Sequence, residues 1–551
     1  MKMHLSKKLF VVLLITALSF SVALTGCGPD NTGVGDDPGD TGPKKGGTVY
    51  LALYQPPNTF VEYFSLGNQA IAPTQLIYQS LYRFEEDGTL IPDLADSHDL
   101  NSEGTEFTFY LAEDAKWHDG EPVTANDVAF TFKTLLHPDF TGSHTSDVKH
   151  LVGASAYNEG TADDVEGIEI VDEHTLKLTI AEPYVPFLER IAMLSILPEH
   201  LLGDADVATL ADTDFAIGDP VGSGPFKFVQ YRTGEYIELE RNAEYVRGEP
   251  YLDKVIIKIV SEEVAIAQLE TGELDANITW YAAGVSPDYV DYLKDLDHIA
   301  MDQFAAPSFV WVVPNMDKAP FNDVNFRRAL NHAIDRDGFV NAVFGGFGEP
   351  AKSPVQPNSP YYADDIPVPA YDVDLAAQYL AETDYNGETI TLLTSDSDER
   401  KRMAQLLEQW WEAIGVDVEI VISDFPTLLN GVTAGDFDIA CMGWSVSAVD
   451  PDYTLTHTLH SVNSAPDGWN FGRYNSDTMD DLLDAARYAV DQDERAQLYH
   501  DVQAEVVDQV PYFYMAYRLS NSARNTRVQN FEDHLFFRTG QSHLWWIDGS
   551  K

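Results

Sequence analysis

A short pattern occurs twice in this chain, at residues 272–280 and 435–444. In both copies a helix-like stretch leads into a glycine, an acidic residue, an apolar residue, an aspartate and a strand-like run that ends in a tryptophan. A helix that passes directly into a strand is typical of α/β sheets, and ligands of open α/β sheets bind at the carboxyl ends of the strands. The pattern therefore predicts two lobes, each with a parallel sheet, whose strand ends at Trp280 and Trp444 face one cleft.

Strand-like and helix-like segments alternate through the rest of the chain. One helix is expected to start after Thr124, a residue type that caps helices, and to end at Pro138. A second is expected over 403–414, where Gly415 ends it. Period-two alternation of apolar residues predicts four strands, at 107–111, 176–180, 255–259 and 416–420. This order of elements predicts an α/β fold.

The N-terminus has the features of an export signal. Three lysines precede an almost wholly apolar run at 9–24, which is shorter than the roughly 20 residues that a membrane span needs. An acidic segment follows, which favours a cleaved signal peptide over a retained helix. The run ends in Leu-Thr-Gly-Cys, which resembles the lipobox of bacterial lipoproteins and implies cleavage after Gly26 and a lipid on Cys27. Ordinary secretion with Cys27 as a free thiol is the alternative. Residues 28–47, rich in glycine, proline and aspartate, predict a flexible tether.

The composition is strongly acidic. There are 89 acidic and 34 basic residues, which gives a formal net charge of −55. This excludes nucleic-acid binding through a broad basic surface and attraction to anionic lipid headgroups. We hypothesise a salt-rich exterior, because screening shortens to about 3 Å in 1 M salt; plain acidic solubility is the alternative. Two cysteines, Cys27 and Cys441, are too few for a disulfide scaffold or a four-cysteine zinc site.

The sequence contains none of the familiar catalytic motifs for a nucleophile elbow, a phosphate-binding loop or a zinc protease. Residues 222–225 (Gly-Ser-Gly-Pro) predict a tight turn, and 116–120 (Lys-Trp-His-Asp-Gly) predict a turn with a packed tryptophan. His457 and His460 could share a helix face, but no third metal ligand accompanies them. We therefore expect no enzyme activity, no cofactor and no metal.

An ordered string of motifs resembles the signature of the family 5 extracellular solute-binding proteins, which serve ABC importers for peptides and nickel. The matching segments are 92–95, 107–111, 116–128, 222–226, 241–245 and 326–335. Segments 157–160, 167–168 and 182–188 look most like the oligopeptide-binding branch.

The resemblance implies a two-lobed, periplasmic-binding-protein-like fold of type II, with an extra inserted subdomain and hinge closure on a ligand held between the lobes. Residues 308–313 would form one of the strands that cross between the lobes. The implied parts are a signal peptide (1–26), a lipid anchor and tether (27–47), lobe I (48–80 with 217–310 and 513–551), the inserted subdomain (81–216) and lobe II (311–512).

A peptide ligand would be held by main-chain pairing and by roomy pockets with aromatic walls. The candidate ligand-binding residues are Tyr54, Trp280, Tyr281, Trp311, Trp444, Ser445, Ser447 and Asp450. Each aromatic residue among them could instead belong to the core. In dipeptide binders of the family, an aspartate that captures the peptide's amino terminus falls at Ser447, and a hydroxyl cannot supply that ion pair. Either Asp450 takes over this role or the ligand has no free amine there; Asp450 could equally be a turn residue before Pro451.

The resemblance thus implies a lipid-anchored monomer at the outer face of the cell membrane, which faces a periplasm if an outer membrane exists. It would capture oligopeptides and deliver them to the membrane subunits and ATPases of an ABC permease, with no nucleic-acid partner. An oligosaccharide is an alternative ligand, because tryptophans stack on sugar rings and the amine-capturing aspartate is missing. A nickel chelate is another alternative, because His457 and His460 could contribute metal ligands. A secreted hydrolase is a further class, but no nucleophile and base support it.

Overall fold

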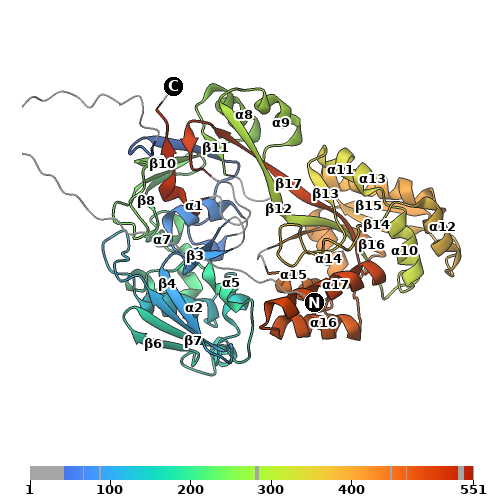
Figure 1. Cartoon of the computed structure of the whole chain (residues 1–551), viewed down its shortest axis with the longest axis horizontal. Helices are drawn as coiled ribbons and strands as arrows, with labels where there is room; N and C mark the ends of the chain where they lie inside the picture. The colour runs from blue at the N-terminus through green and yellow to red at the C-terminus, as the bar shows by residue number, and fades with distance from the viewer. Residues whose placement is uncertain are drawn as a thin grey trace, which may run out of the picture. The chain divides into compact units, whose positions relative to one another are not determined.

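An 11-stranded mixed sheet runs through the computed structural model of this chain (Figure 1). Its order is β15-β14-β16-β12-β17-β11-β1-β10-β9-β8, and β13 pairs with β17 outside this path. The strands are β1 (Thr48–Leu53), β8 (Phe226–Arg232), β9 (Tyr236–Arg241), β10 (Lys254–Ile259), β11 (Ala276–Asn277), β12 (Ile299–Pro314), β13 (Gly348–Pro350), β14 (Ile390–Ser395), β15 (Val418–Ser423), β16 (Ile439–Ser445) and β17 (Phe513–Asn525).

The structure describes residues 42–65, 68–85, 89–278, 284–446, 450–466, 468–531 and 539–549. The predicted signal peptide and the lipidation site Cys27 lie outside these residues, as do Trp280, Tyr281 and Ser447. Within the described part of the chain, no helix is long and apolar enough to cross a membrane.

Two parallel units within the sheet confirm the repeated pattern. β1 is parallel to both β10 and β11, and β14 is parallel to both β15 and β16. In each unit a helix ends at a glycine with positive φ, Gly272 (φ 73°) after α8 (Glu262–Thr271) and Gly435 (φ 84°) after α14 (Phe425–Ala434). Glycine takes this left-handed conformation without steric cost, which ends the helix and turns the chain into β11 or β16.

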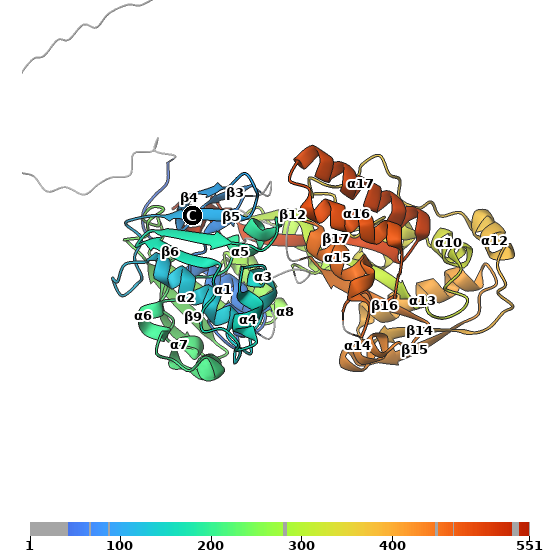
Figure 2. The same cartoon turned by 90° about the horizontal axis from the view of Figure 1, so that it is seen from below.

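A ribbon of two long strands joins the two units (Figures 1 and 2). β12 and β17 pair antiparallel from Ile299↔Asn525 to Val312↔Phe513, with a register shift between Ala305 and Phe309. One end of β17 pairs with β11, whereas the other end of β12 pairs with β16. We call lobe I the part built on β1 and its partners, and lobe II the part built on β14 and its partners.

The two lobes have separate cores. Around β1, Val49, Leu51 and Leu53 belong to one large cluster, and Ala52, on the other face of the strand, belongs to a smaller one. In lobe II the alternating side chains of β12 divide between two clusters, with Trp311 on one face and Val310 and Val312 on the other. This alternation is what a strand buried on both faces requires. The remaining β12 residues in these clusters are Phe309 and Val313, both on the Trp311 face.

A second, four-stranded sheet in lobe I has the order β4-β5-β7-β6. The strands predicted at 107–111 and 176–180 are β5 (Glu106–Leu111) and β7 (Thr175–Thr179). The predicted cap is also confirmed: Thr124 and Asp127 form a capping box at the start of α2 (Ala125–Leu136). The other strands outside the main sheet are β2 (Tyr82–Phe84), β3 (Leu90–Pro92), β4 (Ala95–Leu100), β6 (Ile168–Asp172), β18 (Val528–Gln529) and β19 (Trp546–Ile547).

Helices cover both lobes, and α16 and α17 lie side by side in lobe II (Figure 2). The helix predicted over 403–414 is α13, which buries Met403, Leu407 and Trp411 and is followed by Gly415 at φ 90°. The remaining α-helices of lobe I are α1 (Ile71–Ile77), α3 (Thr145–Val148), α4 (Ala154–Asn158), α5 (Phe187–Ala192), α6 (Glu199–Leu202), α7 (Asp214–Ile217) and α9 (Pro287–Lys294). Those of lobe II are α10 (Val324–His332), α11 (Arg336–Phe344), α12 (Val373–Ala381), α13 (Asp398–Glu412), α15 (Asp452–Leu459), α16 (Asp477–Tyr488) and α17 (Gln492–Gln509). Short 3-10 helices are η1 (Glu62–Phe64), η2 (Asn68–Ala70), η3 (Val207–Asp212), η4 (Ser461–Asn463) and η5 (Ser542–Leu544).

The two predicted turns, 116–120 and 222–225, bind each other. His118 donates its backbone N–H to the Gly222 carbonyl (2.7 Å), and its Nε2 lies 3.0 Å from the Gly224 carbonyl oxygen. Burial lowers the pKa of His118 to about 4, so the ring is neutral near pH 7. Trp117 is buried beside it. These residues are scaffold, which confirms the structural interpretation of the Lys-Trp-His-Asp-Gly segment.

Candidate functional site

The carboxyl ends of both parallel units point at the middle of the β12–β17 ribbon. β16 ends at Ser445, opposite Ser308 of β12. β11 runs antiparallel to β17 and ends at Asn277, whose side-chain oxygen accepts from the backbone N–H of Ala523. Tyr54 directly follows β1, which is parallel to β11 and therefore ends at the same edge. Because open α/β sheets bind ligands at such edges, this region is the candidate binding site.

Two tryptophans form an aromatic corner at the lobe II edge. Trp444 is half-buried, and its Nε1 donates to Thr454 Oγ1 (3.3 Å). Its ring meets that of Trp469 edge to face at 5.7 Å, and Trp469 is 46% exposed. Ser445, the next residue after Trp444, is exposed. Sequence reasoning missed Trp469, although its position in a Pro-Asp-Gly-Trp turn marks it as a loop tryptophan.

Trp311 does not line this edge. Its side chain has no exposed surface, and its ring packs against those of Tyr512 (4.4 Å) and Tyr514 (6.1 Å). The expected wall residue is thus a core residue behind Trp444, whose ring it meets edge to face at 6.1 Å. The physical reason is the strand period, which turns Trp311 toward the same buried face as Phe309.

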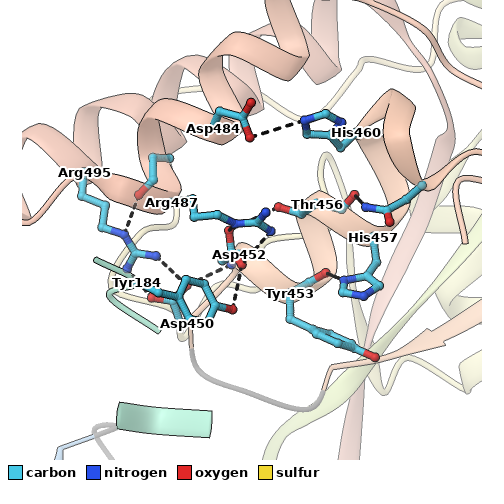
Figure 3. Close-up of polar contacts among 12 residues, drawn as sticks. Tyr184, Asp450, Asp452, Tyr453, Thr456, His457, His460, Asp484, Arg487 and Arg495 are labelled. Atoms are coloured by element: carbon cyan, nitrogen blue, oxygen red, sulfur yellow. Dashed lines mark hydrogen bonds and ion pairs between the residues drawn. The ribbon is translucent and has the colours of Figure 1, made fainter. Parts of the chain in front are cut away.

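Asp450 is buried and fully engaged (Figure 3). Arg495 donates to both of its carboxylate oxygens, with 2.9 Å between Nη2 and Oδ1, and the backbone N–H of Asp452 donates to Oδ1 (2.9 Å). Arg495 places its other donors on the Ala486 carbonyl and on the hydroxyls of Tyr361 and Tyr499. The structure therefore does not present Asp450 as a free acceptor for a ligand amine. It fixes the start of the segment that leads into α15.

Asp452 forms a second ion pair beside the first (Figure 3). Arg487 donates to its two oxygens at 3.1 and 3.2 Å, and Thr456 Oγ1 donates to Oδ1. The hydroxyl of Tyr184, a lobe I residue, also donates to Asp452 Oδ2 (3.1 Å). This hydrogen bond joins the two lobes through buried groups.

Helix α5 of lobe I supplies two more contacts to the same segment. Glu189 Oε2 accepts the backbone N–H of Asp450 (3.0 Å), and the Arg190 guanidinium lies 4.3 Å from the centroid of the Tyr453 ring. Burial, with the nearby Asp450 charge, raises the pKa of Glu189 to about 7, whereas the hydrogen bond from the Asp450 N–H and the charges of Arg495 and Arg190 act in the opposite direction. Sequence reasoning missed both residues. Acidic side chains are so abundant that Glu189 does not stand out, and Arg190 belongs to no recognised motif.

The two histidines considered as metal ligands have separate partners. His457 Nδ1 lies 2.7 Å from the Tyr453 carbonyl oxygen, and His460 lies 3.4 Å from both Asp480 and Asp484. Among the described residues, no group of three or more His, Cys, Asp and Glu side chains could hold a metal ion. Cys441 is a free, buried thiol whose pKa burial raises to about 12, so it is unreactive near neutral pH.

Comparison with known proteins gives consistent matches over most of the chain. The model of the bacterial extracellular solute-binding proteins, family 5, matches residues 89–466. The oligopeptide-binding protein AppA of Bacillus subtilis is 27% identical over 97% of both chains. Heme-binding protein A of Haemophilus influenzae is 28% identical over 84% of this chain and 86% of its own. The solved structure of B. subtilis AppA in complex with a nonapeptide superimposes with a TM-score of 0.73 at 26% identity, covering 92% of this chain and 100% of that one.

Proposed function

This chain belongs to family 5 of the bacterial extracellular solute-binding proteins, and from that membership we propose that it is the oligopeptide receptor of an ABC importer. Proteins of this family bind solutes for transport and are not enzymes. The observation that carries the peptide assignment is the similarity to oligopeptide-binding AppA along almost the whole length of both chains. The structure of that relative holds a nonapeptide.

The proposed peptide site lies between the lobes, over the middle of the β12–β17 ribbon. Trp444, Ser445 and Tyr54 line it, and the exposed ring of Trp469 extends its aromatic wall. Trp280, Tyr281 and Ser447 remain proposed members. Trp311 and Asp450 act behind the site, since their side chains are buried against Tyr512 and Arg495. An extended peptide would satisfy its backbone groups there by main-chain pairing.

The separate cores support the proposed division into lobes. Apart from β12 and β17, the buried residues of the two lobe II clusters lie within 311–512, and those of the lobe I clusters lie before and after it. The half-buried Phe347 of lobe II packs against the smaller lobe I cluster. We propose lobe I as 48–80, 217–310 and 513–551, the inserted subdomain as 81–216, and lobe II as 311–512.

The proposed location is the outer face of the cell membrane. Residues 1–26 would be the signal peptide, Cys27 the lipid attachment point and 28–47 the tether. This arrangement holds a monomeric receptor near the permease subunits to which it delivers peptide. Labelling of cells with a radioactive fatty acid tests it: the label is expected on the protein and lost in Cys27→Ala.

The alternative ligands differ in their support. An aromatic corner such as Trp444 and Trp469 would also stack on sugar rings, so an oligosaccharide remains the second candidate. The nickel-chelate alternative gains nothing from His457 and His460, because His457 Nδ1 is engaged with the Tyr453 carbonyl and both nitrogens of His460 lie beside Asp480 and Asp484.

A thermal-shift panel in high salt tests the ligand class. Nonapeptides are expected to raise the unfolding temperature, because a ligand at 100 times its Kd adds about 2.7 kcal/mol of stability. Oligosaccharides and a nickel–histidine mixture are expected to leave it unchanged. Trp469→Ala should reduce the peptide shift, whereas the matched change of an exposed aromatic away from the site, Tyr371→Ala, should not. A shift with oligosaccharides alone would contradict the peptide assignment.

A further inference from the structure

Three residues of lobe I bind one short segment of lobe II. We call this the interlobe contact; its members are Tyr184, Glu189 and Arg190 from lobe I and Asp450, Asp452 and Tyr453 from lobe II. The segment begins at Asp450, just after the strand end that carries Trp444 and Ser445. The interlobe contact therefore lies close in the chain to the proposed binding site.

Charge within the interlobe contact is balanced everywhere except at Glu189. Asp450 pairs with Arg495, Asp452 with Arg487, and Arg190 with Asp147. In the described part of the chain Glu189 forms no ion pair, and its carboxylate accepts the backbone N–H of Asp450. The carboxyl therefore lies between the lobes, only partly buried and without a matched cation.

The charged and titratable groups near Glu189 come from two helices and two connecting segments. Asp450 precedes α15, Arg495 lies on α17, Arg190 lies on the same helix α5, and Tyr361 follows β13. Asp450 and Arg495 hold each other through two hydrogen bonds, so their charges largely cancel at Glu189. Burial is then the leading influence, and it favours the neutral carboxyl.

We propose that Glu189 is a positioning residue for ligand capture, which links the lobes at the Asp450 backbone and takes up a proton when they close. This inference rests on the proposed function. A protonated carboxyl keeps its carbonyl oxygen as an acceptor for the Asp450 N–H and no longer faces the Asp450 carboxylate as an anion. Separation of the lobes removes both the burial and the Asp450 charge, so the carboxyl returns to an ordinary acid.

The direction of the pH effect follows from linkage. The pKa of Glu189 is about 7 in the closed arrangement, against an ordinary value of 4.5. The closed state therefore binds the extra proton. The free energy that this proton contributes to closure is fully present below pH 4.5 and is lost as the pH rises through about 7. Because ligand binding is coupled to closure, the affinity should fall by up to about 27-fold between pH 5.5 and pH 8 and level off above that.

Titration calorimetry at constant high salt tests this with a defined nonapeptide and the full chain as exported by its host. Wild type is expected to lose up to about 27-fold in affinity from pH 5.5 to 8. Glu189→Gln mimics the neutral carboxyl and keeps an acceptor, so it should bind at pH 8 as tightly as wild type does at pH 5.5, with a flat profile. Glu189→Ala lacks the acceptor and should be weaker at every pH. Glu166→Gln, an exposed acid with no such contact, should keep the wild-type profile.

A flat profile in wild type, with Glu189→Gln weaker at every pH, would overturn the inference and assign Glu189 a merely structural role. X-ray scattering of the ligand-free protein separates this from failure of the peptide assignment. The radius of gyration of wild type should fall from pH 8 to 5.5, while that of Glu189→Gln stays constant. If the radius of gyration changes in this way but no peptide binds, Glu189 is still the proton-linked contact and only the proposed ligand is wrong. A wild-type radius independent of pH would contradict the inference.

Discussion

Asp450 and Arg495 form a bidentate ion pair whose side chains are only 4% and 1% exposed. The pair lies 45 residues apart in the chain and ties the segment before α15 to helix α17. It thereby fixes the lobe II side of the interlobe contact.

Replacement of Arg495 by Met should destabilise the protein by about 3–5 kcal/mol, because Asp450 would be left as an unpaired buried charge. Guanidinium unfolding curves measure this loss. The double variant Asp450→Asn with Arg495→Met removes the stranded charge and should lose less than the sum of the two single variants. A loss of stability in the double variant equal to the sum of the losses in the two single variants would show that the two side chains are not coupled.

Replacement of Trp311 by Ala should cost about 3–5 kcal/mol of folding stability, the range for a large buried aromatic. Trp469→Ala removes a ring that is 46% exposed and should cost less than about 1 kcal/mol. Peptide affinity should respond in Trp469→Ala, which stays folded. Equal losses of stability in the two variants would mean that the rings are equally buried in solution.

Replacement of Gly222 by Ala should destabilise lobe I by about 1–3 kcal/mol or more, as expected for overpacking. A Cβ there would lie 1.9 Å from the backbone oxygen of Ile77. Gly218 provides the matched control, because a Cβ at that position meets nothing within 4 Å. Thermal unfolding of both variants gives the comparison, and a Gly222→Ala variant as stable as Gly218→Ala would refute the close approach.

The acidic composition predicts that salt stabilises the fold. Self-repulsion at a formal net charge of −55 is screened over about 10 Å in 0.1 M salt and over about 3 Å in 1 M salt. The unfolding temperature should therefore rise as sodium chloride is raised from 0.1 to 2 M. The same titration in potassium chloride controls for ion-specific effects. An unfolding temperature that stays constant in both salts would reject the hypothesis of a salt-adapted surface.

Local signals in the sequence were sufficient for the elements but not for the site. The capping box at Thr124 and the glycine stop at Gly415 depend on neighbouring residues, and both were predicted correctly. The same holds for the two glycines before β11 and β16. Trp311 was placed wrongly as a wall residue, since strand alternation does not tell which face of a doubly buried strand meets the ligand.

The interlobe contact could not be read from the sequence because its partners are far apart in the chain. Glu189 and the Asp450 backbone are separated by 261 residues, and Tyr184 and Asp452 by 268. Such pairings depend on how the ribbon places the lobes, which no local pattern records. The resemblance to a family identified the segment around Asp450, but it did not identify the partner Arg495.

Native mass spectrometry of the protein, exported by its host and purified in high salt without unfolding, tests the central claim of an oligopeptide receptor most directly. An oligopeptide receptor should show a ladder of mass additions that dissociates into peptides on activation and gives their range of length. Additions spaced by hexose units, or a single addition of the mass of nickel, would contradict it.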